Sequence, residues 1–246
     1  MCRHLAYLGE PVAIRRLILD PPHGLYRQSW APRLQQYGTV NADGFGVGWY
    51  ADGDELPARY RREGPIWADA NLADLARTVR TRALVAAVRS ATEGCAAGET
   101  AAAPFAAGRW LFSHNGALPG WPERYGPLAA ELPATELLEL TARTDSALVW
   151  ALVLHRLRAG AALGEALAET VRAVAKYGDA RLNLLATDGT SIAATAWGDT
   201  LFHRVRPGSG VLVASEPGDD SPGWSEVPDR SLLLATAAGV TVHPID

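Results

Sequence analysis

The order of its periodic segments is the feature that most constrains the fold of this chain. Two stretches in the middle, residues 145–158 and 163–176, carry apolar residues at helical spacing, and the second ends near Gly178 as a helix stop does. Short apolar runs bounded by turn residues predict strands around them, at 45–50, 84–88, 109–112, 182–186, 191–197, 201–205, 211–214, 232–235 and 240–243. Strands, then two helices, then more strands favour an α+β layered fold over alternating βαβ units.

The length of 246 residues allows one large domain or two small ones. No internal repeat or low-complexity linker divides the chain, so we expect a single domain over residues 1–246. The Ala- and Gly-rich stretch 94–108 is expected as a flexible surface loop, and the Pro- and Asp-rich stretch 216–230 as a long loop.

Composition argues against several classes of function. With 23 basic and 27 acidic residues the net charge is −4, and the basic residues form no long run, so nucleic acid is not an expected partner. No run approaches the roughly 20 apolar residues of a membrane span, and the opening residues 1–4 lack a secretory signal. Two cysteines, Cys2 and Cys95, fit a reducing compartment. We therefore expect a cytoplasmic protein with no membrane partner.

Cys2 is the first candidate for chemistry. Removal of the initiator methionine, which a small second residue permits, would leave Cys2 with both a thiol and a free α-amine. The thiolate is the attacking species, and a free cysteine titrates near 8.5. An α-amine titrates at roughly 7.7–8.0 and can therefore act as the base near neutral pH. The alternative is that this cysteine is incidental to a frayed terminus.

Three further positions each carry a chemical and a structural interpretation. The Asn115 amide and the backbone N–H of Gly116 can converge on one oxygen as an oxyanion hole, but Asn-Gly is also typical of a tight turn. Arg89, at the end of an apolar strand, can grip a carboxylate by a two-pronged pair or form a structural ion pair. Asp145 opens the first helix, where it can pair with a substrate ammonium or complement the helix N-terminus.

The glycine-rich run 41–48 predicts a turn that enters a strand where backbones pass closely. It lacks the strand-then-helix context of a dinucleotide-binding loop. The six histidines show no metal-ligand spacing. We therefore expect neither a cofactor nor a metal.

Taken together and in this order, these motifs resemble the glutaminase domain of class II glutamine amidotransferases: Cys2, residues 41–46, Arg89 with Thr92, Asn115-Gly116, and Asp145. The resemblance implies the four-layer αββα sandwich of N-terminal-nucleophile hydrolases. Further motifs extend it over nearly the full length, toward the ergothioneine-pathway branch of that family, at residues 1–5, 20–22, 28–32, 41–44, 181–183, 214–217, 223–224 and 227–230.

The resemblance also implies catalytic roles. Cys2 would be the nucleophile and its amine the general base, while Asn115 and Gly116 would form the oxyanion hole. The branch hydrolyses the γ-glutamyl amide bond of γ-glutamyl-hercynylcysteine sulfoxide, through a thioester on the cysteine, to glutamate and hercynylcysteine sulfoxide. Two alternatives stay open, namely a glutaminase subunit that passes ammonia to a separate synthase, and a non-catalytic binding module.

The substrate is expected to be a small γ-glutamyl compound, which carries a carboxylate and an ammonium on one carbon. The resemblance implies that Arg89 binds this carboxylate, that Asp145 binds the ammonium, and that Thr92 lines the pocket. Many family members have a histidine after that threonine, where this chain has Glu93. The leaving group carries a quaternary ammonium, which favours aromatic faces. The early segment offers several aromatic residues that could equally pack a core: Tyr26, Trp30, Trp49, Tyr50 and Trp67.

Overall fold

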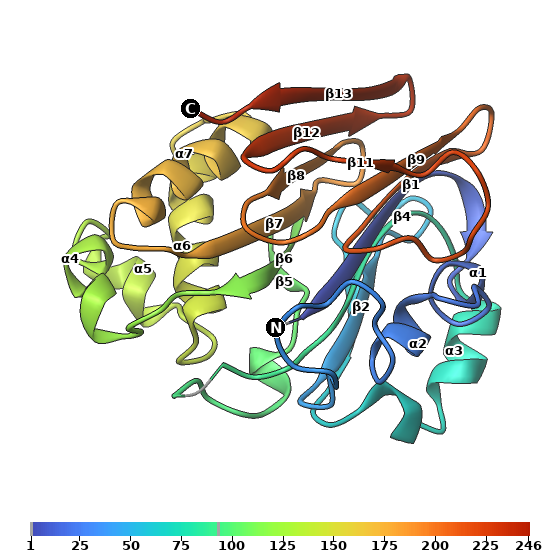
Figure 1. Cartoon of the computed structure of the whole chain (residues 1–246), viewed down its shortest axis with the longest axis horizontal. Coiled ribbons are helices and arrows are strands. Elements are labelled where there is room, and N and C mark those ends of the chain that lie inside the picture. Colours follow the sequence, from blue (N-terminus) through green and yellow to red (C-terminus); the bar gives the residue numbers. More distant parts are fainter. Residues whose placement is uncertain (1, 93) are drawn as a thin grey trace.

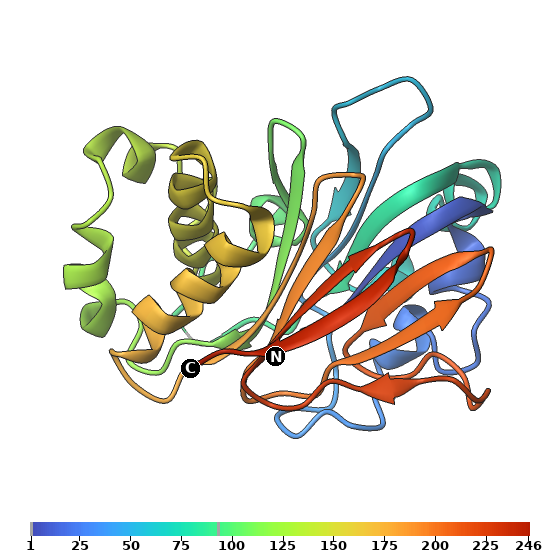
Figure 2. The ribbon, with the colours of Figure 1, turned by 90° about the horizontal axis from the view of Figure 1, so that it is seen from above.

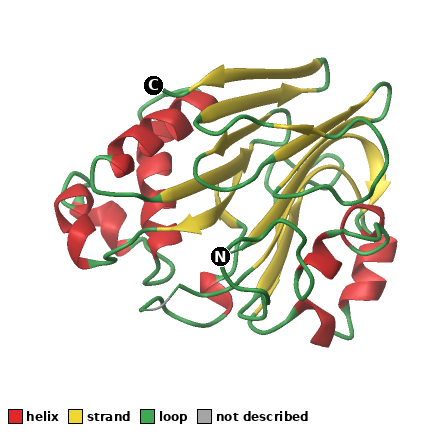
Figure 3. Ribbon diagram, in the orientation of Figure 1, coloured by secondary structure: helices red, strands yellow, loops and turns green. Residues whose placement is uncertain are grey.

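Two antiparallel β-sheets stacked face to face form the centre of the computed structural model, which describes residues 2–92 and 94–246. Helices cover the outer face of each sheet, so the chain is built in four layers (Figures 1 and 2). Figure 3 shows the strands gathered between two groups of helices. The structure therefore confirms the expected α+β class and the αββα sandwich.

The seven-stranded sheet has β1 near its centre. The order of its strands is β11 (Ser225–Glu226), β9 (Phe202–Arg206), β10 (Gly210–Ala214), β1 (Arg3–Ala13), β4 (Arg80–Val88), β2 (Phe45–Trp49) and β3 (Ala58–Arg62). On its outer face lie three short helices, α1 (Arg15–Ile18), α2 (Leu25–Gln28) and α3 (Leu72–Thr78).

The six-stranded sheet has β7 and β6 beside each other. The order of its strands is β13 (Gly239–Pro244), β12 (Ser231–Thr236), β8 (Ile192–Ala196), β7 (Arg181–Thr187), β6 (Trp110–Ala117) and β5 (Phe105–Ala107). Its outer face is covered by the two long helices, α6 (Asp145–Arg158) and α7 (Leu163–Ala175).

Shorter helices complete the structure: α4 (Gly126–Ala129), α5 (Ala134–Leu138) and the 3-10 turns η1 (Ile66–Ala68), η2 (Glu99–Ala101) and η3 (Glu123–Tyr125). Across the described residues, none of the helices has the length and apolar character needed to cross a membrane.

Side chains alternate between the two faces of each strand, and in this way they fill three separate apolar layers. On β1, Ala6 and Leu8 enter the core between the sheets, while Leu5 and Tyr7 pack outward against α1–α3. On β6, Leu111 lies between the sheets and Phe112 packs against α6 and α7. Because both faces of these strands are covered, apolar residues follow one another in parts of them, at residues 5–8 of β1 and 110–112 of β6.

Several predicted boundaries needed correction. The helix predicted at 145–158 is confirmed as α6, and the one at 163–176 is α7, one residue shorter. Strand β6 continues five residues beyond the predicted end at 112 because it pairs with β7 as far as Ala117. The stretch 94–108, expected as a loop, contains η2 and β5, and Phe105 of β5 is buried in the helix-side core.

Candidate active site

Cys2 stands directly before β1 and contacts Asn115 on β6 of the other sheet. The backbone nitrogen of Cys2 donates to Asn115 Oδ1 at 3.1 Å. The half-buried sulfur lies 4.0 Å from the carbonyl oxygen of Ser90. Asn115 is fully buried, and among the described residues its Nδ2 has no hydrogen-bond partner. Because a buried amide donor is costly to leave unpaired, Nδ2 is available to a ligand atom that accepts a hydrogen bond.

Gly116 follows Asn115 within strand β6, so the tight-turn interpretation of this pair is wrong. A Cβ on Gly116 would collide with the carbonyl oxygen of Arg181 and come within 2.6 Å of His114 Nε2. Those two atoms hydrogen-bond each other at 3.0 Å, and His114 Nδ1 lies 3.0 Å from Ser146 Oγ. Burial lowers the pKa of His114, which keeps the ring neutral. The backbone beside Asn115 is thus fixed by a contact that only glycine allows.

Asp145 is the first residue of α6, after the N-cap Thr144. The carboxylate is almost fully buried and accepts the backbone N–H of Ser146 at 2.7 Å, which agrees with a role at the helix N-terminus. It also contacts two segments outside the helix, because Oδ2 accepts from Leu118 N at 3.3 Å and Oδ1 lies 3.7 Å from Cys95 Sγ. The position therefore serves the helix and still presents a buried anion to the loop that carries Cys95.

Arg89 follows β4 and is 7% exposed. Its guanidinium donates to the carbonyl oxygens of Asp43 at 3.3 Å and Ala96 at 2.8 Å. Within the described part of the chain no carboxylate lies within 4.0 Å of it, so the structural ion pair considered for Arg89 is not found among these residues. A buried cation held by neutral carbonyls retains its attraction for an anionic ligand.

Residues 95 and 96 lie between these two opposite charges. Cys95 contacts Asp145 through its sulfur, and the next residue bonds Arg89. Burial, followed by the Asp145 charge, raises the pKa of the Cys95 thiol. The half-buried Thr92 stands at the start of the same loop and accepts the N–H of Cys95 at 3.1 Å. Glu93 lies outside the described residues.

The glycine-rich run enters β2 as a turn, as its composition predicts. Asp43 Oδ2 accepts the N–H of Ala91 at 2.8 Å, which ties the run to the loop after Arg89. Gly44 has a φ of +136°, a conformation that favours glycine. At Gly46, a Cβ would collide with the carbonyl oxygen of Ala103. The glycines therefore allow the close backbone approach that was expected.

Sequence reasoning misses Arg3, a fully buried cation next to Cys2. Its Nε donates to the carbonyl oxygen of Cys2 at 2.8 Å. Burial lowers the pKa of Arg3, and the charges of Glu216 and Asp199 oppose that shift. Glu216 also accepts the backbone N–H groups of residues 33 and 34 at 2.9 and 2.6 Å. The motif at 214–217 is the sequence signal for this network, although it does not reveal the partners.

The aromatic candidates separate into two groups. One group forms an edge-to-face series with ring centroids 5.0 and 5.6 Å apart: Tyr26, Trp30 and Trp67. Arg27 already lies over the Trp30 ring, 5.1 Å from its centroid. Tyr50 packs between the sheets and donates to the carbonyl oxygens of residues 109 and 187, and Trp49 packs against the outer core. Tyr50 therefore belongs to the core and is removed from the candidates for a ligand cage.

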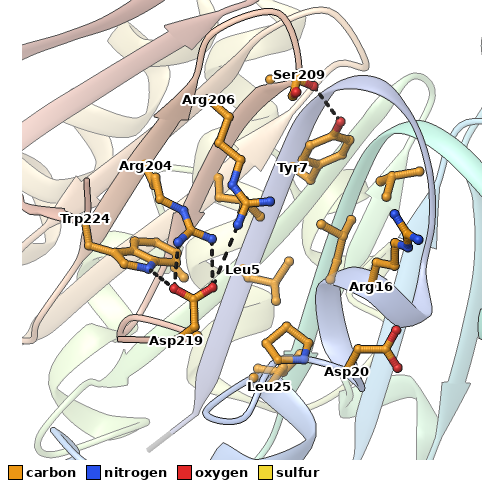
Figure 4. A pocket seen from close by; sticks show the side chains of 18 of the residues that line it. Leu5, Tyr7, Arg16, Asp20, Leu25, Arg204, Arg206, Ser209, Asp219 and Trp224 are labelled. Atoms are coloured by element: carbon orange, nitrogen blue, oxygen red, sulfur yellow. Dashed lines mark hydrogen bonds and ion pairs between the residues drawn. The ribbon is translucent and has the colours of Figure 1, made fainter. Parts of the chain in front are cut away.

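A separate cavity of about 520 Å³ opens on the outer face of the seven-stranded sheet. Figure 4 shows Leu5 and Tyr7 in its floor, with a charged cluster at one side. There Arg204 donates to both carboxylate oxygens of Asp219, at 2.6 and 3.0 Å, and stacks on Trp224. None of the predicted site residues lines this cavity, which lies on the opposite face of β1 from the core between the sheets.

Comparison with known proteins agrees with the geometry. Residues 27–209 match the family of class-II glutamine amidotransferases. The chain is 45% identical over its full length to the whole of the γ-glutamyl-hercynylcysteine sulfoxide hydrolase of Mycolicibacterium smegmatis. It is 44% identical to the protein of the same name from Mycobacterium tuberculosis, of which it covers 97%.

A solved class-II glutamine aminotransferase domain protein from Silicibacter pomeroyi has the same fold, with a TM-score of 0.69, 24% identity and 99% of each chain covered. An αββα sandwich with a cysteine directly before its first strand defines the class of protein. This chain belongs to the class II glutamine amidotransferase family.

Proposed function

We propose that this protein is an amidohydrolase that cleaves the γ-glutamyl amide bond of γ-glutamyl-hercynylcysteine sulfoxide, with Cys2 as nucleophile. The observation that carries the proposal is the contact between Cys2 and Asn115. The nitrogen that would become the α-amine donates to Asn115 Oδ1, and the Nδ2 donor of the same buried amide has no partner among the described residues, which supports an oxyanion site next to Cys2. The two relatives with the name of this activity match the chain over its whole length.

The glutamyl half of the substrate is assigned to the region around residues 95 and 96. Arg89 would bind the α-carboxylate and Asp145 the α-ammonium, with Thr92 in the wall between them. Both charges are almost fully buried, so each interacts strongly with a ligand of opposite charge. Fixing this zwitterion at one end orients the γ-carbonyl carbon toward the thiol.

The reaction follows from these positions. The α-amine of Cys2 takes the thiol proton, and the thiolate attacks the γ-carbonyl carbon. Asn115 Nδ2 and the N–H of Gly116 would donate to the oxyanion. Collapse breaks the carbon–nitrogen bond as the ammonium protonates the departing nitrogen, which leaves a γ-glutamyl thioester. Water then adds to the thioester, releasing glutamate and restoring the thiol.

One experiment separates the candidate functions. Protein with a free Cys2 amine is incubated with γ-glutamyl-hercynylcysteine sulfoxide and, separately, with glutamine, and glutamate release is measured. We expect rapid release from the conjugate, slow release from glutamine, and none from a Cys2→Ala variant whose thermal unfolding matches that of the wild type. Preference for glutamine, stimulated by a synthase, would indicate an ammonia-supplying subunit. No release from either compound would indicate a binding module.

We further infer that the protein acts in the cytoplasm on a small-molecule substrate, as one domain over residues 1–246. Both cysteines are free thiols, as a reducing compartment maintains them. A thiol nucleophile with an amine base needs this state, because oxidation of Cys2 would remove the attacking sulfur.

A further inference from the structure

Arg181 opens β7 on the face of the six-stranded sheet that carries Asn115. The register pairs Asn115 with Asn183 across β6 and β7. Side chains two residues apart on a strand point to the same face, so Arg181 shares the face of Asn183. Leu182, between them, packs in the helix-side core. Arg181 therefore extends toward the seven-stranded sheet, on the side where Cys2 lies.

The Arg181 guanidinium is held in place, but not all of its N–H donors have partners among the described residues. Its Nε donates to Asp199 Oδ2 at 3.3 Å, and its Cζ lies 4.1 Å from the centroid of the Tyr37 ring. The arginine side chain is 20% exposed, whereas that of Asp199 is 2% exposed. Among the described residues neither Nη group of Arg181 has a hydrogen-bond partner. The two Nη groups form the edge of a guanidinium that matches the two oxygens of a carboxylate.

The two other cations near the nucleophile, Arg3 and Arg89, have other contacts or other proposed roles. Arg3 is fully buried and donates to the carbonyl oxygen of Cys2, so a ligand does not reach it. Arg89 lies on the other sheet, at the end of β4, in the region assigned to the glutamyl half. Arg181 comes from the six-stranded sheet. Its strand, β7, pairs with β6, and Asn115 on β6 contacts Cys2.

We propose that Arg181 binds a carboxylate on the leaving group, which makes the enzyme selective for γ-glutamyl conjugates of α-amino acids. In such conjugates the carbon bonded to the scissile nitrogen carries a carboxylate, whereas glutamine carries only hydrogens on that nitrogen. Tyr37 is a positioning residue, because its ring holds the Arg181 guanidinium in the orientation in which it would bind the carboxylate. The inference rests on the proposed function, since the cysteine of a hercynylcysteine leaving group is such an amino acid.

Two substrates isolate this carboxylate, because γ-glutamylglycine and γ-glutamylmethylamide differ by it alone. The quantity measured is the ratio of kcat/KM for the first over the second. We expect Arg181→Gln to lower this ratio about 10- to 100-fold, the scale of hydrogen bonds to a charged group. Arg181→Lys keeps the charge but loses the fork, so the ratio falls less. Arg206→Gln, an exposed arginine beside Asp219 in the other sheet, keeps the wild-type ratio.

Tyr37 provides an independent test of positioning. Tyr37→Phe keeps the ring over the guanidinium and should keep the ratio, whereas Tyr37→Ala should lower it. A structural role alone would lower kcat/KM equally for both substrates and leave the ratio unchanged. Thermal unfolding of each variant shows that it is folded.

A binding measurement separates this inference from the proposed function. In a Cys2→Ala background, calorimetry gives the Kd of both compounds without turnover, and Arg181→Gln should remove the preference for γ-glutamylglycine. A wild-type protein that releases no glutamate overturns the proposed function, while this binding preference still tests Arg181. Equal binding of the two compounds with Arg181 in place, or a preference that survives Arg181→Gln, overturns the role of Arg181.

Discussion

Asn115 accepts the hydrogen bond from the Cys2 nitrogen on one end of its amide and keeps the other end without a partner among the described residues. The side chain is fully buried, so its orientation is set by the packing of β6 between two layers. Through this one group, the position of the proposed base and the position of the proposed oxyanion donor are coupled.

Replacing Asn115 by aspartate separates these two roles. Asn115→Asp has the same shape and keeps an oxygen for the Cys2 nitrogen, but it lacks the Nδ2 donor. We expect kcat to fall on the order of 10²–10³, the usual effect of losing one oxyanion donor. Steady-state glutamate release, with thermal unfolding as the control for folding, measures this. A wild-type kcat in Asn115→Asp would exclude Nδ2 from the oxyanion site.

The free amine of Cys2 can be tested without changing the residue. We expect protein made with a cleavable leader before Cys2 to be inactive, because a peptide nitrogen has no basicity near neutral pH. Cleavage that leaves Cys2 first in the chain should raise kcat by about 10²–10⁴, the range of general-base catalysis. Mass spectrometry and a rate assay before and after cleavage measure this. Equal rates in both forms would show that the amine is not the base.

Asp145 should determine affinity for the glutamyl half of any substrate. Losing one partner of a buried charge pair costs about 2–5 kcal/mol, so Asp145→Asn should raise KM about 30-fold or more. The effect should be similar for the sulfoxide conjugate and for γ-glutamylmethylamide. Glu139→Gln, an exposed carboxylate paired with Arg158, is the matched control and should keep KM. A change confined to one leaving group would place Asp145 on the other side of the scissile bond.

The fold could be predicted best where one period persists over several turns. Helices α6 and α7 keep their apolar spacing for three turns or more, and both were predicted to within one residue. Strand β6 shows where this fails, because three consecutive residues, 113–115, are polar although the strand is buried. Ser113 contacts His4 of β1, and His114 contacts Ser146 of α6. Those partners lie far along the chain, so local propensity does not contain them.

In the candidate site, too, some residues could be predicted from the sequence and others could not. Cys2, Arg89 and Asp145 could be selected because their residue types suit the chemistry and their order resembles a family. Cys95 and Arg181 could not, because their places depend on contacts with Asp145 and with the Tyr37 ring from distant segments. The roles of all these residues stay predictions until the variants are measured.

Burial of polar residues on the strands also affects the pKa of His4. The ring lies between the two sheets, and its Nδ1 is 3.1 Å from Ser113 Oγ. Burial, followed by the charges of Arg3 and His114, lowers the pKa of His4 from 6.5 to about 3. The folded state therefore holds this ring neutral at pH values where the unfolded chain protonates it.

We expect this histidine to make the protein acid-sensitive well above the range of its carboxylates. Below pH 6.5, His4 binds a proton in the unfolded state but stays neutral in the folded state. The contribution of His4 to the free energy of unfolding therefore falls by about 1.4 kcal/mol for each pH unit of acidification, until about pH 3. His4→Asn retains a polar group near Ser113 but does not titrate. Urea unfolding between pH 5.0 and 6.5 should therefore give a steeper loss of stability in the wild type than in His4→Asn. Parallel curves would show that His4 has the same pKa in the folded and unfolded states.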